Sequence, residues 1–472
     1  MTRLRRASLA LLAIACAVGA VLVLAAVRPT RALPARAGAP EVRTPLWSAR
    51  RVPELLVLTI ESAAQARAGD ALTKKLTEIV GTTLAPVDAC AAVDGAHGSL
   101  ARIGADRALA PASTLKLLTA TAALNRLGPD HRFTTRVLAG RAGNLVLVGG
   151  GDPLLATPEH IVYEHARAPY RDAPFTALTQ LADAVAAAGV HDVSGALLVD
   201  DHIHDTLRFL PAWKPIYAQE GDVGSLGALT VDGGYADAHD QTPAPDPALT
   251  TGQRLAAMLA ARGITIAGGV RRGLASGDKH EVAHVDSPSL SDIIGEMLTS
   301  SDNYTAEQLL RDIAVSSGSG DVPATTELGV RIVEDQMDVL GVRRTGLVMH
   351  DGSGLAPDDR VTCTTMLQLI ELATEPRFAA IDRGLAVAAR TGTLAQRFVG
   401  DPLAGKLRAK TGSIAGVVGL VGVVDGPDDL RFAFLANGDF SAGAGAQLQV
   451  DVARAVGSIP DVRAPPDLVP PP

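Results

Sequence analysis

The chain has 472 residues, of which 20% are charged, 47% are hydrophobic and only 3% are aromatic. Such a length exceeds one ordinary domain, and the composition is that of a folded protein rich in alanine and glycine, not of a disordered one. The net charge of -8 includes no basic stripe of the kind that nucleic-acid-binding proteins carry. Composition and charge therefore argue against a nucleic-acid partner.

Residues 1–45 are predicted to be a targeting segment and a linker. Arg3, Arg5 and Arg6 precede an uncharged, mostly apolar run over residues 7–27, which is long enough to cross a hydrocarbon core of about 30 Å. The run is either an anchor that stays in the membrane or a signal peptide that is removed after export. Both alternatives place the rest of the chain outside the cytoplasm, in the cell envelope or secreted. A membrane contact is expected only if the segment is not cleaved.

The expected elements follow from the hydrophobic periodicity and the turn residues, in chain order. An apolar segment at 53–60 precedes a helix at 70–80, and two strands at 89–95 and 99–106 form a hairpin. Helices are expected at 115–127, 175–190, 248–264, 289–298, 305–315, up to about 339, and 364–374, and strands at 133–140, 144–153, 195–201, 417–426 and 430–438. The alternation of helices and strands over 143–286 predicts an α/β unit inserted into a main domain. That main domain is expected to comprise 46–142 and 287–460, followed by a proline-rich tail over 461–472.

Two cysteines, Cys90 and Cys363, lie beyond the N-terminal segment. An even number of cysteines in an oxidising compartment favours a disulfide. The alternative is a pair of buried free thiols.

Ser113 and Lys116 stand three residues apart at the start of the helix that stops at Gly128, with Pro111 just ahead of the first turn. At this spacing their Cβ atoms are about 5 to 6 Å apart, so the lysine can reach the serine hydroxyl. A serine hydroxyl is a weak nucleophile until a base takes its proton, and lysine can be that base whereas arginine cannot. Because the chain has 36 arginines and only 7 lysines, a lysine here suggests a proton that must be lost. The alternative is a helix cap beside a solvated lysine.

Two further motifs follow in the chain: Ser301-Asp302-Asn303 between two predicted helices, and Lys410-Thr411-Gly412 just before the last two apolar strands. Each is weak alone. Ser276–Lys279 repeats the first spacing in a polar stretch, Arg390–Gly392 imitates the third motif, and Ser301 and Asn303 could simply cap a helix beginning at Thr305. The order and local context of all three together carry the signal.

In this order the motifs resemble those of the penicilloyl serine transferases, in which Ser-x-x-Lys, Ser-x-Asn and Lys-Thr-Gly line one cleft. The resemblance is more specific to the class C low-molecular-mass penicillin-binding proteins. The features that indicate this class are the long stretch between the first two motifs, GGGDP at 149–153, DGSGL at 351–355 and Gly392-Thr393-Leu394. Those proteins are D-alanyl-D-alanine carboxypeptidases and endopeptidases. The resemblance spans about residues 90–455.

The resemblance implies a multidomain α/β fold without cofactor or metal. A β-lactamase/transpeptidase-like domain would combine a five-stranded antiparallel sheet, flanked by helices, with an all-helical subdomain. An inserted α/β domain would complete the chain.

The resemblance also implies a role for each catalytic residue. Ser113 would attack the carbonyl between the two terminal D-alanines of a peptidoglycan stem peptide, Lys116 would take its proton, and water would release the acyl-enzyme. Ser301 would pass a proton to the leaving amine, and Asn303 would hold the acyl side of the substrate and orient Lys116. Backbone N–H groups of Ser113 and Ser413 would form the oxyanion hole. β-Lactam antibiotics would inhibit by acylating the same serine.

The substrate-binding roles implied by the resemblance fall on the third motif and on the insertion. Lys410 would supply fixed positive potential, and Thr411 and Ser413 would bind the terminal carboxylate. Gly412 would let the ligand approach the strand closely. An acidic residue near the insertion would recognise the amino group of a diamino acid in the stem peptide. Glu220 is the expected residue, and Asp222 is the other candidate.

Three other functions stay open at this point. A β-lactamase would share the acylation but hydrolyse the acyl-enzyme quickly, and an inactive envelope-binding module would keep the fold without acylating. A metal-dependent hydrolase would use the clustered acidic and imidazole groups of Asp200, Asp201, His202, His204 and Asp205. That run directly follows a predicted strand, where adjacent side chains point to opposite faces, so a polar strand end is the favoured interpretation.

Overall fold

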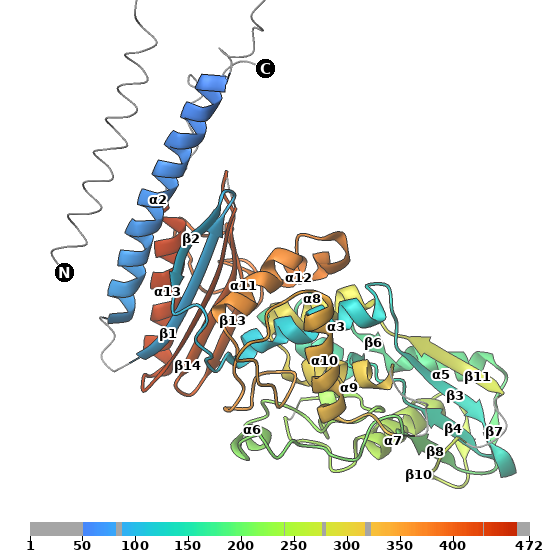
Figure 1. Ribbon diagram of the computed structural model, residues 1–472. Helices are drawn as coiled ribbons and strands as arrows, with labels where there is room; N and C mark the ends of the chain where they lie inside the picture. The colour runs from blue at the N-terminus through green and yellow to red at the C-terminus, as the bar shows by residue number, and fades with distance from the viewer. Residues whose placement is uncertain are drawn as a thin grey trace, which may run out of the picture. The chain divides into compact units, whose positions relative to one another are not determined.

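The computed structural model describes residues 51–81, 87–239, 241–275, 280–316, 322–427 and 429–459 (Figure 1). The predicted N-terminal targeting segment and the proline-rich tail lie outside the described residues. None of the helices in the described ranges is long and apolar enough to cross a membrane.

A six-stranded antiparallel sheet forms the centre of the main body, in the order β12-β13-β14-β15-β1-β2. Its strands are β1 (Val87–Gly95), β2 (Gly98–Ile103), β12 (Ala386–Val387), β13 (Leu407–Ile414), β14 (Val417–Val424) and β15 (Leu430–Gly438). The N-terminal hairpin completes the C-terminal strands, because β1 pairs along its length with β15. The expectation of five strands was wrong by one. The additional strand, β12, has two residues, too few for a periodic pattern in the sequence.

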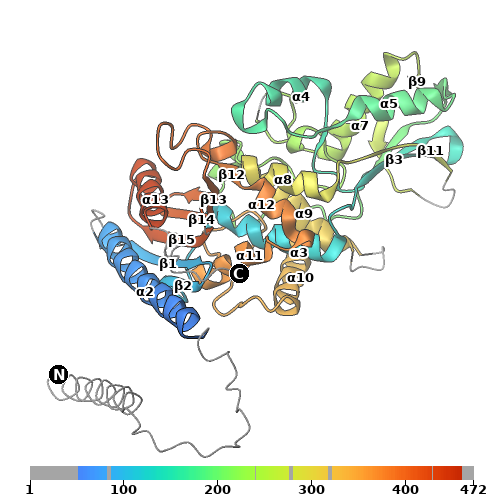
Figure 2. The same ribbon diagram turned by 90° about the horizontal axis from the view of Figure 1, so that it is seen from above.

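Two helices, α2 (Arg51–Gly81) and α13 (Ala442–Gly457), cover one face of this sheet (Figures 1 and 2). Leu72 and Leu76 of α2 join Phe432 and Phe434 of the sheet and Val452 of α13 in one buried cluster. The sequence predicted a separate apolar segment and a helix in this region. The structure has a single continuous helix instead.

The helical subdomain packs against the other face of the sheet (Figure 2). It consists of α3 (Lys116–Leu127), α8 (Leu290–Ser300), α9 (Asn303–Val315), α10 (Thr326–Val339), α11 (Cys363–Leu372) and α12 (Ala379–Gly384). Helix α3 lies at its centre, since every side chain over residues 116–124 is buried. A helix buried on all sides must place each polar group against a specific partner. The first residue of α3, Lys116, is such a group.

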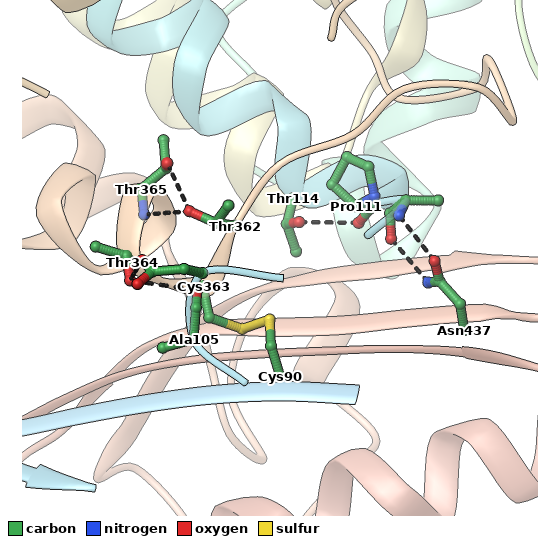
Figure 3. Close-up of a disulfide and its surroundings, with 11 residues drawn as sticks. Cys90, Ala105, Pro111, Thr114, Thr362, Cys363, Thr364, Thr365 and Asn437 are labelled. Atoms are coloured by element: carbon green, nitrogen blue, oxygen red, sulfur yellow. Dashed lines mark hydrogen bonds between the residues drawn. A yellow bond between two sulfur atoms is a disulfide. The ribbon is translucent and has the colours of Figure 1, made fainter. Parts of the chain in front are cut away.

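A disulfide joins Cys90 on β1 to Cys363 at the start of α11, with the two Cα atoms 5.9 Å apart (Figure 3). Both cysteines are fully buried in the cluster between the sheet and the helical subdomain. The predicted pairing is confirmed. The bond ties the sheet to the helices that cover its inner face.

The inserted region has its own five-stranded mixed sheet, in the order β10-β8-β4-β3-β11. Its strands are β3 (Thr134–Ala139), β4 (Leu145–Val148), β8 (Leu197–Asp200), β10 (Val270–Arg272) and β11 (Glu281–Asp286), packed against α5 (Leu178–Ala187) and α7 (Pro247–Ala260). Strand β3 belongs to this sheet because it forms a hairpin with β4, although the boundary predicted at residue 143 assigned it to the main domain. The other domain boundaries stay predictions.

Short elements complete the described chain. The short strands are β5 (Leu155–Ala156), β6 (Thr176–Ala177), β7 (Asp192–Val193) and β9 (Thr265–Ile266), and the short helices are α4 (Pro158–His165) and α6 (Ile216–Gln219). Three 3₁₀ turns bear on the site: η1 (Ala112–Leu115), η3 (Ala168–Tyr170) and η6 (Gly392–Leu394).

Candidate active site

Ser113 lies in the 3₁₀ turn η1 and Lys116 is the first residue of α3, so the chain brings both to one face of the same helical start. Lys116 Nζ lies 2.9 Å from Ser113 Oγ, within hydrogen-bond distance. The preceding residue, Ala112, has a left-handed φ of 48°, a conformation that is strained for alanine. Backbone strain of this kind concentrates at functional sites.

Two more oxygen atoms surround the amine of Lys116. Nζ lies 2.7 Å from Asn303 Oδ1 and 2.9 Å from the backbone carbonyl of Ser353. Both of these oxygens can only accept hydrogen bonds, and a neutral lysine has two N–H groups and one lone pair. The two N–H groups are therefore committed to the carbonyls, and the lone pair is left for the hydroxyl of Ser113. This is the geometry of a base that takes a proton from Ser113.

The orientation of Asn303 is fixed from its far side. Its Nδ2 donates a 2.8 Å hydrogen bond to the backbone carbonyl of Asp222, in the loop that follows α6. Since that carbonyl cannot donate, the amide nitrogen must face it and Oδ1 must face Lys116. The inserted region thus sets the orientation of a group in the main domain.

Burial changes the acidity of Lys116. Loss of hydration lowers the pKa of this fully buried amine to about 8, while Asp302, Asp351 and Glu307 act in the opposite direction. At this pKa an appreciable share of the amine is neutral near neutral pH, as a general base requires.

Lys410 on β13 faces the second motif. Its Nζ donates to Ser301 Oγ at 2.7 Å and to the carbonyl of Thr411 at 2.8 Å. Burial, and secondly the charge of Lys116, lower the pKa of Lys410 well below its usual value. No carboxylate forms an ion pair with it among the residues that the structure describes. The surroundings of Lys410 therefore favour a group that exchanges a proton with Ser301 over the fixed positive charge that the resemblance implied.

The second motif forms the connection between α8 and α9. Ser301 ends α8 with a left-handed φ of 69°, and Asp302 is the N-cap of α9, accepting a 2.6 Å hydrogen bond from the N–H of Thr305. Helix α9 begins at Asn303, earlier than the expected Thr305. The capping role considered for Ser301 and Asn303 thus falls to Asp302. The side chains of Ser301 and Asn303 instead form hydrogen bonds with Lys410 and Lys116, respectively.

The third motif lies on β13, the strand that precedes the hairpin of β14 and β15 in the chain. Thr411 Oγ1 donates a 2.9 Å hydrogen bond to Thr393 Oγ1 in η6, and Ser413 is exposed. Strand β12 pairs with β13 only at Arg408 and Ala409. Within the described chain, the strand edge that carries Thr411 and Ser413 therefore has no neighbouring strand on that side.

Gly412 has a packing role that the sequence did not indicate. A Cβ at this position would lie 2.6 Å from the carbonyl of Pro111 and 3.1 Å from the backbone N of Thr114. Because alternate strand residues point to opposite faces, Gly412 faces inward with Lys410. The glycine lets the strand approach the turn that carries Ser113.

A cavity of about 240 Å³ opens beside the second motif, between it and the inserted region. Its acidic lining residues are Glu164, Asp222, Glu296 and Asp302, and its basic ones are His160 and Arg167. Glu220, the expected acidic site residue, is not among the lining residues, whereas Asp222 is, although both residues are exposed. Position along the loop could not distinguish these two neighbours, because the chain turns between them at Gly221, whose φ is 71°.

The sequence did not indicate the other two carboxylates of this cavity. Burial raises the pKa of Glu296 to about 7 and also raises that of Glu164, although Arg167 lies 2.7 Å from Glu164. Each has one buried oxygen that no hydrogen bond satisfies in the described structure. The cavity therefore suits a group that carries positive charge.

The acidic run at the end of β8 does not form a ligand cluster. Asp201 pairs with Arg208 at 2.9 Å and Arg272 at 2.7 Å, and His204 Nε2 lies 2.8 Å from Asp312 Oδ1. Asp205 pairs with Arg311 and Asp200 with His202. No group of three metal-ligating side chains occurs within the described ranges. These pairs fit the polar strand end.

The two sequences that imitate the motifs can also be placed. Ser276–Lys279 lies outside the described residues. Thr391 Oγ1 accepts a 2.9 Å hydrogen bond from the N–H of Val387. The stretch Arg390–Gly392, which resembles the third motif in sequence, therefore stabilises the turn beside β12.

Two groups of the site were missed because they are backbone carbonyls, those of Asp222 and Ser353. A carbonyl is present at every residue and leaves no signal in a sequence. The segment DGSGL, noted only as part of the resemblance, was the nearest indication of Ser353.

Comparisons with known proteins show the family to which the chain belongs. The model of the D-Ala-D-Ala carboxypeptidase 3 (S13) family matches residues 90–245 and 241–456. Carboxypeptidase DacB of Mycolicibacterium smegmatis is 31% identical over 75% of this chain and 76% of its own length. The D-alanyl-D-alanine carboxypeptidase of Actinomadura sp. is 30% identical over 73% of this chain and 77% of its own.

A solved structure shares the fold. Penicillin-binding protein 4 (DacB) of Haemophilus influenzae superimposes with a TM-score of 0.66 and 20% identity, covering 81% of this chain and 98% of that one. The expected combination of an antiparallel sheet, a helical subdomain and an α/β insertion is confirmed at the level of fold. The family model covers most of the chain, so this protein belongs to the D-Ala-D-Ala carboxypeptidase 3 (S13) family and is a peptidase hydrolase.

Proposed function

We propose that this peptidase is a serine D-alanyl-D-alanine carboxypeptidase and endopeptidase that cleaves peptidoglycan stem peptides through an acyl-enzyme on Ser113. One observation carries the proposal: the two carbonyl acceptors leave the lone pair of Lys116 directed at Ser113 Oγ. The distance of 2.9 Å is that required of a general base and its nucleophile.

The acylation step uses the two lysines in turn. Ser113 Oγ bonds to the carbonyl carbon of the penultimate residue while its proton passes to Lys116. Collapse of the tetrahedral intermediate breaks the C–N bond to the terminal D-alanine. The departing nitrogen takes a proton from Ser301. The proton that Lys116 took from Ser113 returns through Lys410, 2.7 Å from Ser301, to restore the hydroxyl, so both lysines regain their starting charge. Water then hydrolyses the ester and returns the serine.

Strand β13 supports binding of an extended peptide. Its edge at Thr411 and Ser413 is free of a neighbouring strand within the described residues, and an extended ligand can add to such an edge through main-chain hydrogen bonds. In this arrangement Thr411 and Ser413 hold the terminal carboxylate. The N–H groups of Ser113 and Ser413 stabilise the oxyanion.

The acidic cavity supports recognition of the stem peptide's diamino acid. It adjoins Asn303, on the side where the acyl part of the substrate would lie, and it contains Glu164, Glu296 and Asp222. We assign the amino group of the diamino acid to this cavity, in place of the exposed Glu220. A stem-peptide substrate also implies export to the cell envelope, and the Cys90–Cys363 disulfide is compatible with that compartment.

β-Lactams are expected to acylate the same serine and so to inhibit. A structure of the Haemophilus influenzae protein is a complex with a novel β-lactam. The test is to incubate the purified full chain with penicillin and measure its intact mass, with Ser113→Ala beside it. The proposal predicts one stable adduct on the wild type and none on the variant, with release of D-alanine from a stem peptide.

The competing functions give different results in this experiment. Destroyed penicillin without a lasting adduct would indicate a β-lactamase. Intact penicillin and unmodified protein would indicate an inactive binding module.

A further inference from the structure

A loop over residues 350–359, here called the Asp351 loop, supplies the Ser353 carbonyl that contacts Lys116. Three fully buried carboxylates meet at this loop: Glu307, Asp351 and Asp359. Buried carboxylates are expensive unless each oxygen is hydrogen-bonded. Each of them therefore binds N–H groups of the loop, and their positions differ relative to the Ser353 carbonyl.

Glu307 holds the peptide units that precede the contact. Its Oε1 accepts hydrogen bonds from the N–H of Gly352 at 3.0 Å and of Ser353 at 2.8 Å. Thr119 of α3 donates to the carbonyl of Gly352 at 2.8 Å. The residue whose carbonyl contacts Lys116 is thus held by its own N–H.

The other two carboxylates bind other groups of the loop. Asp351 accepts from the N–H groups of Gly354 and Ala356 and from Trp213 Nε1. Asp359 accepts from the N–H of His350. The Gly354 N–H belongs to the same peptide unit as the Ser353 carbonyl, so Asp351 holds Ser353 from its C-terminal side while Glu307 holds it from its N-terminal side. Of these two carboxylates, Glu307 is the one that lies on α9.

Glu307 also lies one helical turn after Asn303 on α9, and side chains four residues apart share a helix face. Helix α9 thereby positions both acceptors of Lys116, the Asn303 amide directly and the Ser353 carbonyl through Glu307. We infer that Glu307 is a positioning residue that holds the Ser353 carbonyl against Lys116 and so aims the amine's lone pair at Ser113. This inference rests on the proposed acyl-enzyme function.

A glutamine at this position would keep the shape but lose the function. Its amide has one acceptor oxygen and an NH₂ group that cannot accept from a backbone N–H. In the wild type, Oε2 of Glu307 also accepts from the N–H of Gly352 at 3.2 Å. An NH₂ group in place of Oε2 would repel that N–H, and the Ser353 carbonyl would move. A misplacement of about 1 Å in a catalytic group can cost about 10²-fold in rate.

The charge of Glu307 has a second, separable effect. The titratable groups that act on Lys116 are Glu307, Asp302 and Asp351, which raise its pKa, and Lys410, which faces it from β13. Burial, and secondly the charge of Asp351, raise the pKa of Glu307 itself to about 8, so part of it is ionised near pH 8. Removing that charge makes the charged amine less stable. A neutral substitution is therefore expected to move the acid limb of the acylation rate to lower pH.

The experiment compares Glu307→Gln with Asp312→Asn. Asp312 is a matched control because it is a fully buried carboxylate on the same helix, but it contacts His204 and not the Asp351 loop. Penicillin acylation rates of the full chain are measured from pH 6 to 9.5, and thermal unfolding confirms that each variant is folded. Glu307→Gln should acylate about 10 to 100 times more slowly. The pH at which its acylation rate reaches half of its maximum should be lower than in the wild type. Asp312→Asn should keep both rate and midpoint.

A third variant, Glu307→Asp, keeps the charge but retracts the oxygens, so its rate should fall while its midpoint stays near that of the wild type. It also answers the question if Glu307→Gln does not fold. A folded Glu307→Gln with the wild-type rate and midpoint would overturn the inference. So would an equal loss in Asp312→Asn. Failure of the wild type itself to form an adduct on Ser113 would instead overturn the proposed function and this inference with it.

Discussion

Charged side chains are held in one way around Ser113 and in another way in the inserted region. Around Ser113 the cations are lysines, and the partners of Lys116 and Lys410 are hydroxyl and carbonyl oxygens. In the insert the buried ion pairs use arginine, and Arg208 and Arg272 both bind Asp201. An arginine held by a carboxylate keeps its charge, whereas a buried lysine without one can lose its proton.

This difference between the two regions suggests a physical reason for the small number of lysines in this chain. Arginine supplies permanent charge for ion pairs that join loops to strands. The two buried lysines of the described chain are Lys116 and Lys410, the residues from which the proposed mechanism requires a proton to leave and return. The predictions below test whether this division holds.

The largest effect is expected from Lys116→Arg. The substitution keeps a cation at the site, but arginine cannot be deprotonated there, so acylation by penicillin should slow by about 10² to 10⁴. Stopped-flow measurement with a fluorescent penicillin gives the rate. The control is Arg272→Lys in the insert, which should acylate like the wild type. A Lys116→Arg protein within about threefold of wild type would end the assignment of Lys116 as the base.

Removal of the disulfide should affect stability without affecting chemistry. The bond between Cys90 and Cys363 closes a loop with a sequence separation of 273 residues, and loss of a native disulfide typically costs about 2 to 5 kcal/mol. Replacing both cysteines by alanine should lower the free energy of unfolding by that amount, measured in denaturant. The folded variant should acylate at the wild-type rate. A large loss of acylation would mean that the bond positions the site directly.

The cavity carboxylate Glu296 should make stability depend on pH. Burial raises its pKa from 4.5 to about 7, so the folded state holds the proton more tightly than the unfolded chain does. Its contribution is fully present below about pH 4.5 and is lost as pH rises through about 7, up to about 3 kcal/mol. Unfolding of wild type and Glu296→Gln at pH 5 and pH 8 measures it. The difference between the two proteins should shift against the wild type at pH 8.

The smallest effect is expected from Asp201→Asn in the insert. It removes the shared carboxylate of Arg208 and Arg272, but Arg272 keeps its 2.7 Å pair with Asp246. The loss should be about 1 to 2 kcal/mol of unfolding free energy, with no change in acylation rate. A slower acylation would show that the arginine pairs of the insert also act on the active site.

Much of the site could be predicted from the sequence because its side chains lie in short, ordered motifs. Ser113 and Lys116 are brought together by a local helical turn, which spacing alone predicts. The pairing of Cys90 with Cys363 followed from the number of cysteines and the predicted compartment. Ser301 and Lys410 are far apart in the chain, and only the resemblance placed them in one cleft.

The parts that could not be predicted depend on backbone positions and tertiary packing. The carbonyls of Asp222 and Ser353 carry no sequence signal, and the role of Gly412 depends on a turn that packs against it from another part of the chain. The exposed position of Glu220 depends on a loop conformation. In the sequence, Glu307 is an ordinary residue of an amphipathic helix, and only the packing of the Asp351 loop against it indicates a role.

The central claim is that neutral Lys116 removes the proton of Ser113, and the pH dependence of acylation tests it most directly. Since burial lowers the pKa of Lys116 to about 8, the penicillin acylation rate of the wild type should rise with pH through a midpoint near 8 and then level off. Lys116→Met should lose both the rate and this limb. A rate that is independent of pH, or the same limb retained in Lys116→Met, would contradict the account.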